Sequence, residues 1–337
     1  AYALTPAQHQ MVEIAKALSR KARIVFMDEP TAALTDRETA TLFTLIRRLS
    51  SEGISFIYIS HRLEEIASIG TRITVLRDGK KIGTVAAATT ERATLIRMMV
   101  GRDIPASGPP VVASDARTIL NVQGLSSAFI ADCSFTLRAG EILGIAGLAG
   151  SGRSELARCL FGADHRTRGT VVLDGEPVHP REPIDAIRAG MAFLTEDRNR
   201  LGLFLQRPIR ENITLTTLDE DVRWGLIDGA AETRRATALA DRFGVKYADM
   251  SHDVDTLSGG NRQKVLFARW LAAKPRLIIV DQPTAGIDVG AKSEIHDELR
   301  TLAASGVGVI VISSELPELL SLCSRIIVMR NRTIAGS

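Results

Sequence analysis

The chain has 337 residues, and 45% of them are hydrophobic. This length predicts about two domains, and the apolar content is sufficient to fill their cores. The 42 basic and 39 acidic residues leave a net charge of +3, and only 4% of the residues are aromatic. Such a composition argues against a nucleic-acid-binding protein, because it provides neither a strongly basic surface nor base-stacking platforms.

The three cysteines, Cys133, Cys159 and Cys323, are widely spaced and form no paired motif. They are typical of core thiols in a reducing compartment rather than of a metal site. No apolar run approaches the 18 residues of a membrane-spanning helix, and we expect neither a membrane span nor a signal peptide.

The first hundred residues alternate short apolar runs with amphipathic segments. We expect helices at 8–18, 37–49, 62–69 and 92–100, and strands at 24–27, 55–59, 72–76 and 81–85. The segment from Gly101 to Ala116 contains three prolines and is typical of a linker. The sequence therefore predicts a first domain at 1–100, a linker at 101–117 and a second domain at 118–337.

The second domain begins with a different pattern. We expect antiparallel-type strands near 119–122 and 134–137, a strand at 142–146, a helix at 153–161, and strands near 170–173 and 191–194. The region 201–255 is mixed and largely helical. Helices at 261–271, 291–304 and 317–322 then alternate with strands at 277–280, 307–312 and 325–329, which predicts an α/β fold with a parallel sheet.

A glycine-rich turn follows the strand at 142–146. Residues 147–154 read GLAGSGRS, which fits the phosphate-binding pattern G-x-x-x-x-G-[K]-[ST] except that Arg153 replaces lysine. In such a turn, small residues let backbone N–H groups wrap the phosphates, a cation meets the outer oxygens and a hydroxyl binds Mg²⁺. The residues predicted to bind are Gly147, Gly150, Ser151, Gly152, Arg153 and Ser154, with Ser154 also as the Mg²⁺ ligand.

A second pair of motifs lies in residues 257–288. Ser258, Gly259 and Gly260 form a small-residue turn directly before a helix, whose N-terminus suits a phosphate. The apolar strand that follows ends in Asp281, which places a carboxylate at the edge of a buried parallel sheet, where a metal–nucleotide can bind. A glycine-rich turn alone occurs in unrelated proteins, but the three motifs in this order predict a nucleotide site.

The chain contains an internal repeat. Residues 4–84 align with residues 257–337 at a constant offset of 253, without a gap. The first copy begins at its counterpart of Ser258 and lacks the half that carries the glycine-rich turn. We therefore expect this chain to be the C-terminal part of a longer protein, and residues 1–100 not to be stable alone.

These motifs resemble those of ATP-binding cassette (ABC) ATPases. The combination of GLAGSGRS, EDR at 196–198, LSGGNRQK, SSELPE and the first-copy DEPTAALT looks like the ATP-binding subunits of bacterial monosaccharide importers of the ribose, galactose and xylose type. The resemblance implies a P-loop NTPase cassette: a mostly parallel core sheet, an antiparallel β part and a helical subdomain, here as one partial and one complete copy.

The resemblance also implies ATP and Mg²⁺ as cofactors and ATP hydrolysis coupled to import. The partners would be two transmembrane permease subunits and, indirectly, a periplasmic sugar-binding protein, with the chain peripheral on the cytoplasmic face of the bacterial inner membrane. We expect the contact to membrane partners at the Glu196 loop and at 201–255. We expect this chain alone to hydrolyse ATP weakly or not at all.

The resemblance assigns roles to residues of both copies. Asp28 and Asp281 would lie on the Mg²⁺ side, and Glu29 would polarise the attacking water. His61 would be the switch residue that contacts the γ-phosphate. Gln282 occupies the position of Glu29 in the second copy, and an amide cannot accept the proton.

Other positions of the second copy also depart from the family pattern. Ser314 replaces the switch histidine, and Glu196 occupies the place of a glutamine. In the first copy Thr35 replaces an aspartate that Asp288 keeps in the second. Phe129 is the candidate for stacking on adenine.

The two signature turns are unequal as well, because Thr5-Pro6-Ala7 replaces Ser258-Gly259-Gly260. Pro6 lacks an N–H group, and Ala7 adds a Cβ where backbone would approach phosphate. In this family the cassettes pair head to tail, so that each site combines one cassette's P-loop with the other's signature. The altered parts would then meet in one site, which predicts one hydrolytic site and one site that holds ATP.

Alternative functions remain open at this point. A nucleoside or signalling-molecule importer would have a similar ATPase subunit, and a non-transport tandem ABC protein would share the cassettes. The latter is disfavoured by the short linker and the altered second site. The motifs do not name the sugar, and they do not decide whether Gln282 is native or engineered.

Overall fold

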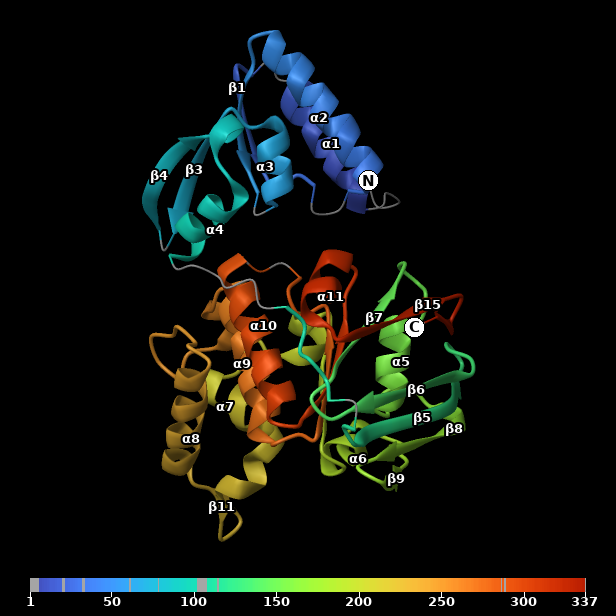
Figure 1. Cartoon of the computed structure of the whole chain (residues 1–337). Helices are drawn as coiled ribbons and strands as arrows, with labels where there is room; N and C mark the ends of the chain where they lie inside the picture. Colours follow the sequence, from blue (N-terminus) through green and yellow to red (C-terminus); the bar gives the residue numbers. More distant parts are fainter. Residues whose placement is uncertain are drawn as a thin grey trace. The chain divides into compact units, whose positions relative to one another are not determined.

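The computed structural model describes residues 6–19, 22–31, 34–60, 62–77, 79–101, 108–113, 115–285, 287 and 289–336. These residues belong to two compact units, residues 1–105 (unit 1) and residues 106–337 (unit 2) (Figure 1). The boundary falls inside the proline-containing segment 101–117.

The core of unit 2 is a six-stranded sheet. Its strands follow the order β10-β13-β14-β7-β15-β16, and all neighbouring pairs are parallel except β15–β16. Their bounds are β7 Ile142–Gly147, β10 Met191–Leu194, β13 Leu277–Asp281, β14 Gly308–Ile312, β15 Arg325–Arg330 and β16 Thr333–Gly336. Every residue of β10, β13 and β14 is buried, as expected for parallel strands that are covered on both faces.

Helices cover this sheet. They are α5 Arg153–Leu160, α6 Pro183–Arg188, α9 Gly259–Ala272, α10 Val289–Ala304 and α11 Leu316–Leu322. Helix α5 packs on β7 and β13, α6 and α9 pack on β10, α10 packs on β14 and β7, and α11 packs on β7. Ser258 caps the N-terminus of α9, because its hydroxyl accepts a hydrogen bond from the N–H of Asn261 in the first turn.

Two further parts complete unit 2. An antiparallel sheet of order β6-β5-β8-β9 contains β5 Thr118–Ser127, β6 Cys133–Arg138, β8 Arg166–Leu173 and β9 Glu176–Val178. The region 198–256 contains η2 Arg198–Gly202, α7 Ile209–Thr214, η3 Leu215–Asp221, the hairpin of β11 Val222–Arg223 and β12 Leu226–Ile227, α8 Gly229–Arg242 and η4 Val254–Thr256. Helices α7 and α8 pack on each other and on α9.

The predicted fold class is confirmed for unit 2: a mostly parallel core sheet, an antiparallel β part and a helical part are all present. The predicted elements agree with the structure, and the main difference is that β5 and β8 are several residues longer than expected. The sequence reading omitted the short elements α6, β9, β16 and the β11–β12 hairpin, because these segments contain too few apolar residues to display a hydrophobic period.

Unit 1 contains α1 Pro6–Ser19, β1 Ile24–Asp28, α2 Asp36–Ser51, β2 Ser55–Ile59, α3 Leu63–Ile69, β3 Arg72–Arg77, β4 Lys80–Ala86, η1 Ala87–Thr89 and α4 Arg92–Val100. Its strands form two separate pairs, parallel β1–β2 and antiparallel β3–β4. Helix α2 begins at a capping box in which Thr35 and Glu38 satisfy each other's backbone N–H groups.

The elements of unit 1 correspond to those that close unit 2. Each of the six elements from α9 to β15 begins and ends 253 residues after its counterpart from α1 to β3. The strand register corresponds as well, because Ile24 pairs with Ser55 and Leu277 pairs with Gly308. One difference stands out: β7 lies between β14 and β15, whereas no strand of the described part of unit 1 joins β2 to β3.

Candidate functional site

The glycine-rich turn joins β7 to α5 and has a tight backbone. Gly147, Gly150 and Gly152 have φ angles of 157°, 76° and 103°, a region that favours glycine. A Cβ atom at Gly147 would lie 2.5 Å from Ser151 Oγ and 2.6 Å from the carbonyl oxygen of Met329. A Cβ at Gly150 would meet no atom within 4 Å, so its backbone faces open space where a phosphate could approach.

Arg153 and Ser154 occupy the first turn of α5, next to this loop. The guanidinium Nη1 of Arg153 donates a hydrogen bond of 2.8 Å to the carbonyl oxygen of Ser313, at the end of β14. The predicted phosphate cation is thus held between the glycine-rich turn and the residue before Ser314. Ser154 lies close enough to Asp281 to lower the pKa of its carboxyl group.

Asp281 ends β13 and is only 2% exposed. Burial raises the pKa of this carboxyl group to about 6, Ser154 opposes the rise, and nearby Glu196 adds to it. Among the residues that the structure describes, its Oδ1 atom has no hydrogen-bond partner. A buried carboxylate oxygen beside a hydroxyl is the hard oxygen environment that suits Mg²⁺.

Gln282 follows Asp281 in a left-handed backbone conformation, with φ of 52°. Its N–H donates to the carbonyl oxygen of Ile312 over 2.8 Å. Its side-chain Oε1 lies 3.3 Å from the backbone nitrogen of Ser314 and 3.2 Å from Ser314 Oγ, and both donate to it. Gln282 and Ser314, two of the positions at which the second copy departs from the first, are therefore hydrogen-bonded to each other.

The corresponding backbone in unit 1 has the same geometry. Asp28 ends β1, and Glu29 has φ of 43° and donates its N–H to the carbonyl oxygen of Ile59 over 2.9 Å. Glu29 is thus presented at the sheet edge in the same way as Gln282. His61 lies outside the described residues, as do Thr5 and Asp288.

The turn formed by Ser258, Gly259 and Gly260 opens α9. Ser258 Oγ accepts hydrogen bonds from the backbone and side-chain nitrogens of Asn261, at 3.5 and 3.0 Å. Within the described part of unit 2, no hydrogen bond joins these three residues to the glycine-rich turn. The structure therefore does not bring them together with Gly147–Ser154, whereas it does bring Ser154 to Asp281 and Gln282 to Ser314.

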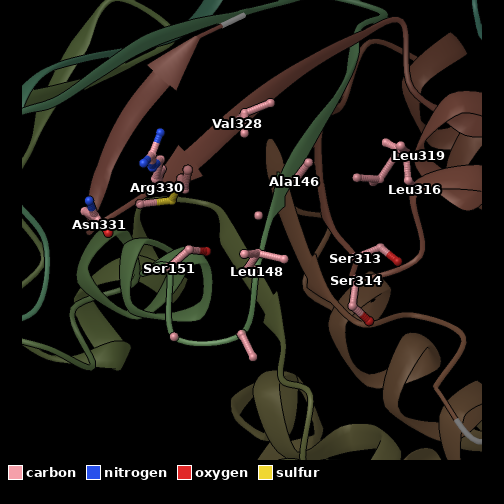
Figure 2. Close-up of a pocket in the computed structure, with 14 residues that line it drawn as sticks. Ala146, Leu148, Ser151, Ser313, Ser314, Leu316, Leu319, Val328, Arg330 and Asn331 are labelled. Atoms are coloured by element: carbon pink, nitrogen blue, oxygen red, sulfur yellow. The ribbon is translucent and has the colours of Figure 1, made fainter. Parts of the chain in front are cut away.

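A cavity of about 540 Å³ opens beside the glycine-rich turn. Figure 2 shows Leu148 and Ser151 on this turn, with Ser313 and Ser314 on one side and Arg330 and Asn331 on the other. The cavity therefore borders the glycine-rich turn, while the predicted site residues Ser154, Asp281 and Gln282 lie outside its lining.

Other predicted positions fall around this edge of the sheet. Phe129, the adenine candidate, is exposed, and Glu196 follows β10. Arg198, two residues later, donates to the carbonyl oxygen of Ala285 over 2.9 Å and to Gln263 of α9 over 3.4 Å. This arginine connects the Glu196 loop to the turn after β13 and to the signature helix.

The sequence reading missed a buried glutamate, Glu318, which bonds Thr284 and Ser313 on the two loops that carry Gln282 and Ser314. The signal was present in the repeat, because Thr31, Ser60 and Glu65 are the same residue types at the offset of 253.

In the described part of the chain, no helix has the length and hydropathy needed to cross a membrane. No cluster of three His, Cys, Asp or Glu residues that could hold a metal by itself is found among the same residues. A metal at Asp281 would therefore depend on oxygens other than those of a protein cluster, as is usual for Mg²⁺ bound with a nucleotide.

Comparison with known proteins gives a consistent answer. The family model described as "ABC transporter" matches residues 130–285. The "Ribose import ATP-binding protein RbsA 3" of Rubrobacter xylanophilus is 48% identical over 334 residues, which cover 99% of this chain and 67% of that protein. The "Ribose import ATP-binding protein RbsA 1" of Burkholderia ambifaria is 47% identical over 336 residues, 99% of this chain and 65% of that protein.

Solved structures show the same fold. A nucleotide-free ATP-binding cassette from an ABC transporter matches with a TM-score of 0.56 and 21% identity, over 65% of this chain and 90% of that one. A cassette in a dimeric post-hydrolysis state with ADP and Pi matches with a TM-score of 0.56 and 23% identity, over 64% of this chain and 97% of that one.

The chain spans about 65% of the length of the curated relatives it matches. Its similarity to them nevertheless runs through both units, since 99% of the chain is aligned. The motifs, the fold and the relatives agree, and the chain belongs to the ABC transporter ATP-binding family.

Proposed function

We propose that this chain is part of the ATP-binding and ATP-hydrolysing subunit of an ABC transporter that imports a monosaccharide. Ribose is the favoured solute, because the relatives at 47–48% identity are named as ribose import ATP-binding proteins. The observation that carries the proposal is the meeting of the glycine-rich turn, Ser154 and Asp281 at one edge of the sheet, with a buried carboxylate oxygen left without a partner among the described residues.

In the proposed site the backbone N–H groups of Gly147–Gly152 hold the phosphates of ATP. Ser154 and Asp281 hold Mg²⁺, which neutralises the charge of the phosphate oxygens when it is bound. Arg153 supplies a positive charge beside the turn, and its hydrogen bond to Ser313 restricts how its planar group can turn toward a phosphate.

We further propose that the two ATP sites differ. Gln282 is an amide that cannot accept a proton, and its carbonyl oxygen is already used by Ser314. The site with Gly147–Ser154, Asp281 and Gln282 would hold ATP. The site with Asp28, Glu29 and His61 would hydrolyse it.

The domain organisation belongs to the same proposal. Residues 1–100 would be the C-terminal half of a first cassette, 101–117 a linker and 118–337 a second cassette. In unit 2 the P-loop strand β7 separates β14 from β15, and in unit 1 a cavity of about 1370 Å³ is lined by both β2 and β3. This cavity is where a counterpart of β7 would fit.

The partners would be two transmembrane permease subunits at the cytoplasmic face of the bacterial inner membrane, with a periplasmic sugar-binding protein acting through them. Leu201 and Phe204, which follow the Glu196 loop, are 70% and 58% exposed. Two large apolar side chains at the surface support a protein contact there. If crosslinks from this region reached only proteins other than the permease subunits, they would contradict this placement.

Two measurements test the function. Binding of MgATP to this chain should raise its melting temperature, and Asp281→Ala should remove the Mg²⁺-dependent part of that rise. In the full-length protein, a single-turnover assay should lose hydrolysis with Glu29→Gln and change little with Ser314→Ala. Equal losses would contradict the asymmetry, and absence of any nucleotide effect would contradict ATP binding itself.

A further inference from the structure

Glu318, on α11, is a buried carboxylate at the centre of a hydrogen-bond cluster. The residue is 3% exposed. Its oxygens accept hydrogen bonds from Thr284 Oγ1 at 2.7 Å and Ser313 Oγ at 2.6 Å, and His296 Nε2 of α10 lies 2.8 Å away. Lys292 of the same helix approaches within 3.8 Å. The negative charge is thus compensated, as burial requires.

The cluster joins the two loops that present Gln282 and Ser314. Thr284 is two residues after Gln282, and Ser313 is the residue before Ser314. The β13–β14 ladder ends at the pair Asp281 and Ile312, with one further backbone bond from Gln282 to Ile312. Beyond that point, two sets of bonds connect the turn after β13 to the end of β14: those of Ser314 to the Gln282 side chain, and those of Thr284 and Ser313 to the Glu318 carboxylate.

Unit 1 contains the same bridge. Glu65, on α3, accepts from Thr31 Oγ1 at 2.7 Å and from Ser60 Oγ at 3.0 Å. Thr31 and Ser60 are the counterparts of Thr284 and Ser313, so the same two hydroxyl groups donate to the carboxylate in each unit.

The remaining partners of the two carboxylates differ. Glu65 also accepts from the hydroxyl of Tyr58 at 2.8 Å and from Arg62 at 2.9 Å, whereas Glu318 faces His296 and Lys292 of the neighbouring helix. The charge compensation has therefore changed between the copies while the bonds to the two loops have not. This pattern indicates that the loop-to-loop bridge is the functional part of the cluster.

We propose that Glu318 and Glu65 are positioning residues. Glu318 holds Gln282 and Ser314 at the spacing that receives the γ-phosphate, and Glu65 acts in the same way on the two corresponding loops of unit 1. The inference rests on the proposed function, because it assumes that ATP binds at this edge. It goes beyond that function in one respect: the distance between Gln282 and Ser314 is set by the Glu318 carboxylate of α11 as well as by the β13–β14 ladder.

The consequence is specific to the third phosphate. In the proposed site the backbone of the glycine-rich turn would contact mainly the inner phosphates, which ADP and ATP share. Only the γ-phosphate of ATP would reach Gln282 and Ser314. In Glu318→Gln, the amide nitrogen replaces an acceptor with a donor, so one of the two hydroxyls loses its charged acceptor and has to turn to accept from the amide instead. The preference for ATP over ADP should then fall about tenfold, the effect of roughly one lost hydrogen bond to a charged group.

The experiment measures affinities of the 337-residue chain for MgATP and MgADP by isothermal titration calorimetry. Glu318→Gln should weaken MgATP binding about tenfold and leave MgADP binding unchanged. Glu315→Gln is the matched control: Glu315 is three residues earlier, its side chain is 56% exposed, and its carboxylate pairs with Lys292 rather than with the loops. It should leave both affinities unchanged.

Thr284→Val provides a second, nearly isosteric variant that removes one hydroxyl and keeps the carboxylate. It should lower the ATP preference in the same direction, by a smaller factor. A folded Glu318→Gln or Thr284→Val protein that keeps the wild-type ratio of ATP to ADP affinity would overturn the positioning role. Equal weakening for both nucleotides would assign the cluster a purely structural role, and failure of the wild-type chain to bind either nucleotide would overturn the proposed function on which the inference rests.

Discussion

Strands β1 and β13 occupy the same place in the two copies, yet their environments differ. In unit 2, Leu277 and Ile279 are 0% exposed; their counterparts in unit 1, Ile24 and Phe26, are 57% and 70% exposed. The strands have the same length and the same register with their neighbours. Local pattern therefore builds the strand pair in both units, and burial of its second face depends on what else packs there.

The covering elements in unit 2 are identifiable. Helix α5 packs on β13, and β7 pairs with β14. Both carry the glycine-rich turn, so the part that completes the hydrophobic core is also the part that binds phosphate in the proposed function. The comparison between the two units can be challenged at both levels, in chemistry and in packing.

The largest effect is expected at Glu29 and Gln282, the residues that follow β1 and β13. In the full-length protein, Glu29→Gln should lower the hydrolysis rate by about 10²–10⁴-fold, because a general base is lost. Gln282→Glu should leave the rate nearly unchanged, because Arg153 and Ser314 remain altered at the second site. Single-turnover assays compare the two exchanges directly, and a large gain from Gln282→Glu would show that the second site lacks only its base.

A smaller but still large effect concerns packing. Ile279→Asp places an acid in a fully buried strand and should destabilise unit 2 by about 4 kcal/mol or more. The matched change Phe26→Asp, at an exposed position of β1, should alter stability by less than about 1 kcal/mol. Urea denaturation of the 337-residue chain would measure both. Similar losses would mean that the face of β1 is covered in solution.

Replacing Asp281, in contrast to the change at Ile279, is expected to raise the free energy of unfolding. Its pKa is raised from 3.8 to about 6 in the folded state, so the folded protein binds more protons between these values. Stability in the absence of Mg²⁺ should therefore fall as pH rises through this window and stay lower above it. Asp281→Asn should raise the free energy of unfolding at neutral pH by about 3 kcal/mol, with no gain below the lower pKa.

The matching measurement for Asp281→Asn is a series of denaturation curves from acid to neutral pH without Mg²⁺. The same variant should lose Mg²⁺-dependent ATP binding. A variant that is less stable than wild type at neutral pH would contradict the view that the carboxylate is held there for a ligand rather than for the fold.

Glu318 should show an effect of about the same size as Asp281, again with a defined pH dependence. Burial raises its pKa, but the His296 hydrogen bond, Lys292 and the two hydroxyls outweigh burial and lower the pKa from 4.5 to about 2. The stabilisation is therefore present above pH 4.5 and is lost as pH falls toward 2.

Glu318→Gln should cost about 3 kcal/mol at neutral pH, and the difference from wild type should shrink across that acid window. Glu315→Gln, whose carboxylate is 56% exposed, serves as the control and should cost less than about 1 kcal/mol. A difference that stays constant down to the lowest pH would contradict a stabilising role for the ionised carboxylate.

Particular elements show how far the sequence could be followed. Three features could be predicted from the sequence, because periodicity and turn residues are local signals: the repeat at 253 residues, the glycine-rich turn and the apolar strand ending in Asp281. Helix α6 and strands β9 and β16 could not, because such short segments form only against neighbours. The bond between Arg153 and Ser313 joins residues 160 positions apart, and no local pattern predicts it.

By itself, the sequence determined the order of elements, the duplication and the residue types available at the nucleotide site, including the amide at Gln282 and the hydroxyl at Ser314. Only the tertiary structure decided that Gln282 and Ser314 bond each other, that Asp281 keeps an oxygen without a partner among the described residues, and that Glu318 bridges the loops behind them. The reason is physical: helices and strands follow from neighbours along the chain, whereas the bonds of buried polar groups depend on which distant segments the packed core brings within about 3 Å.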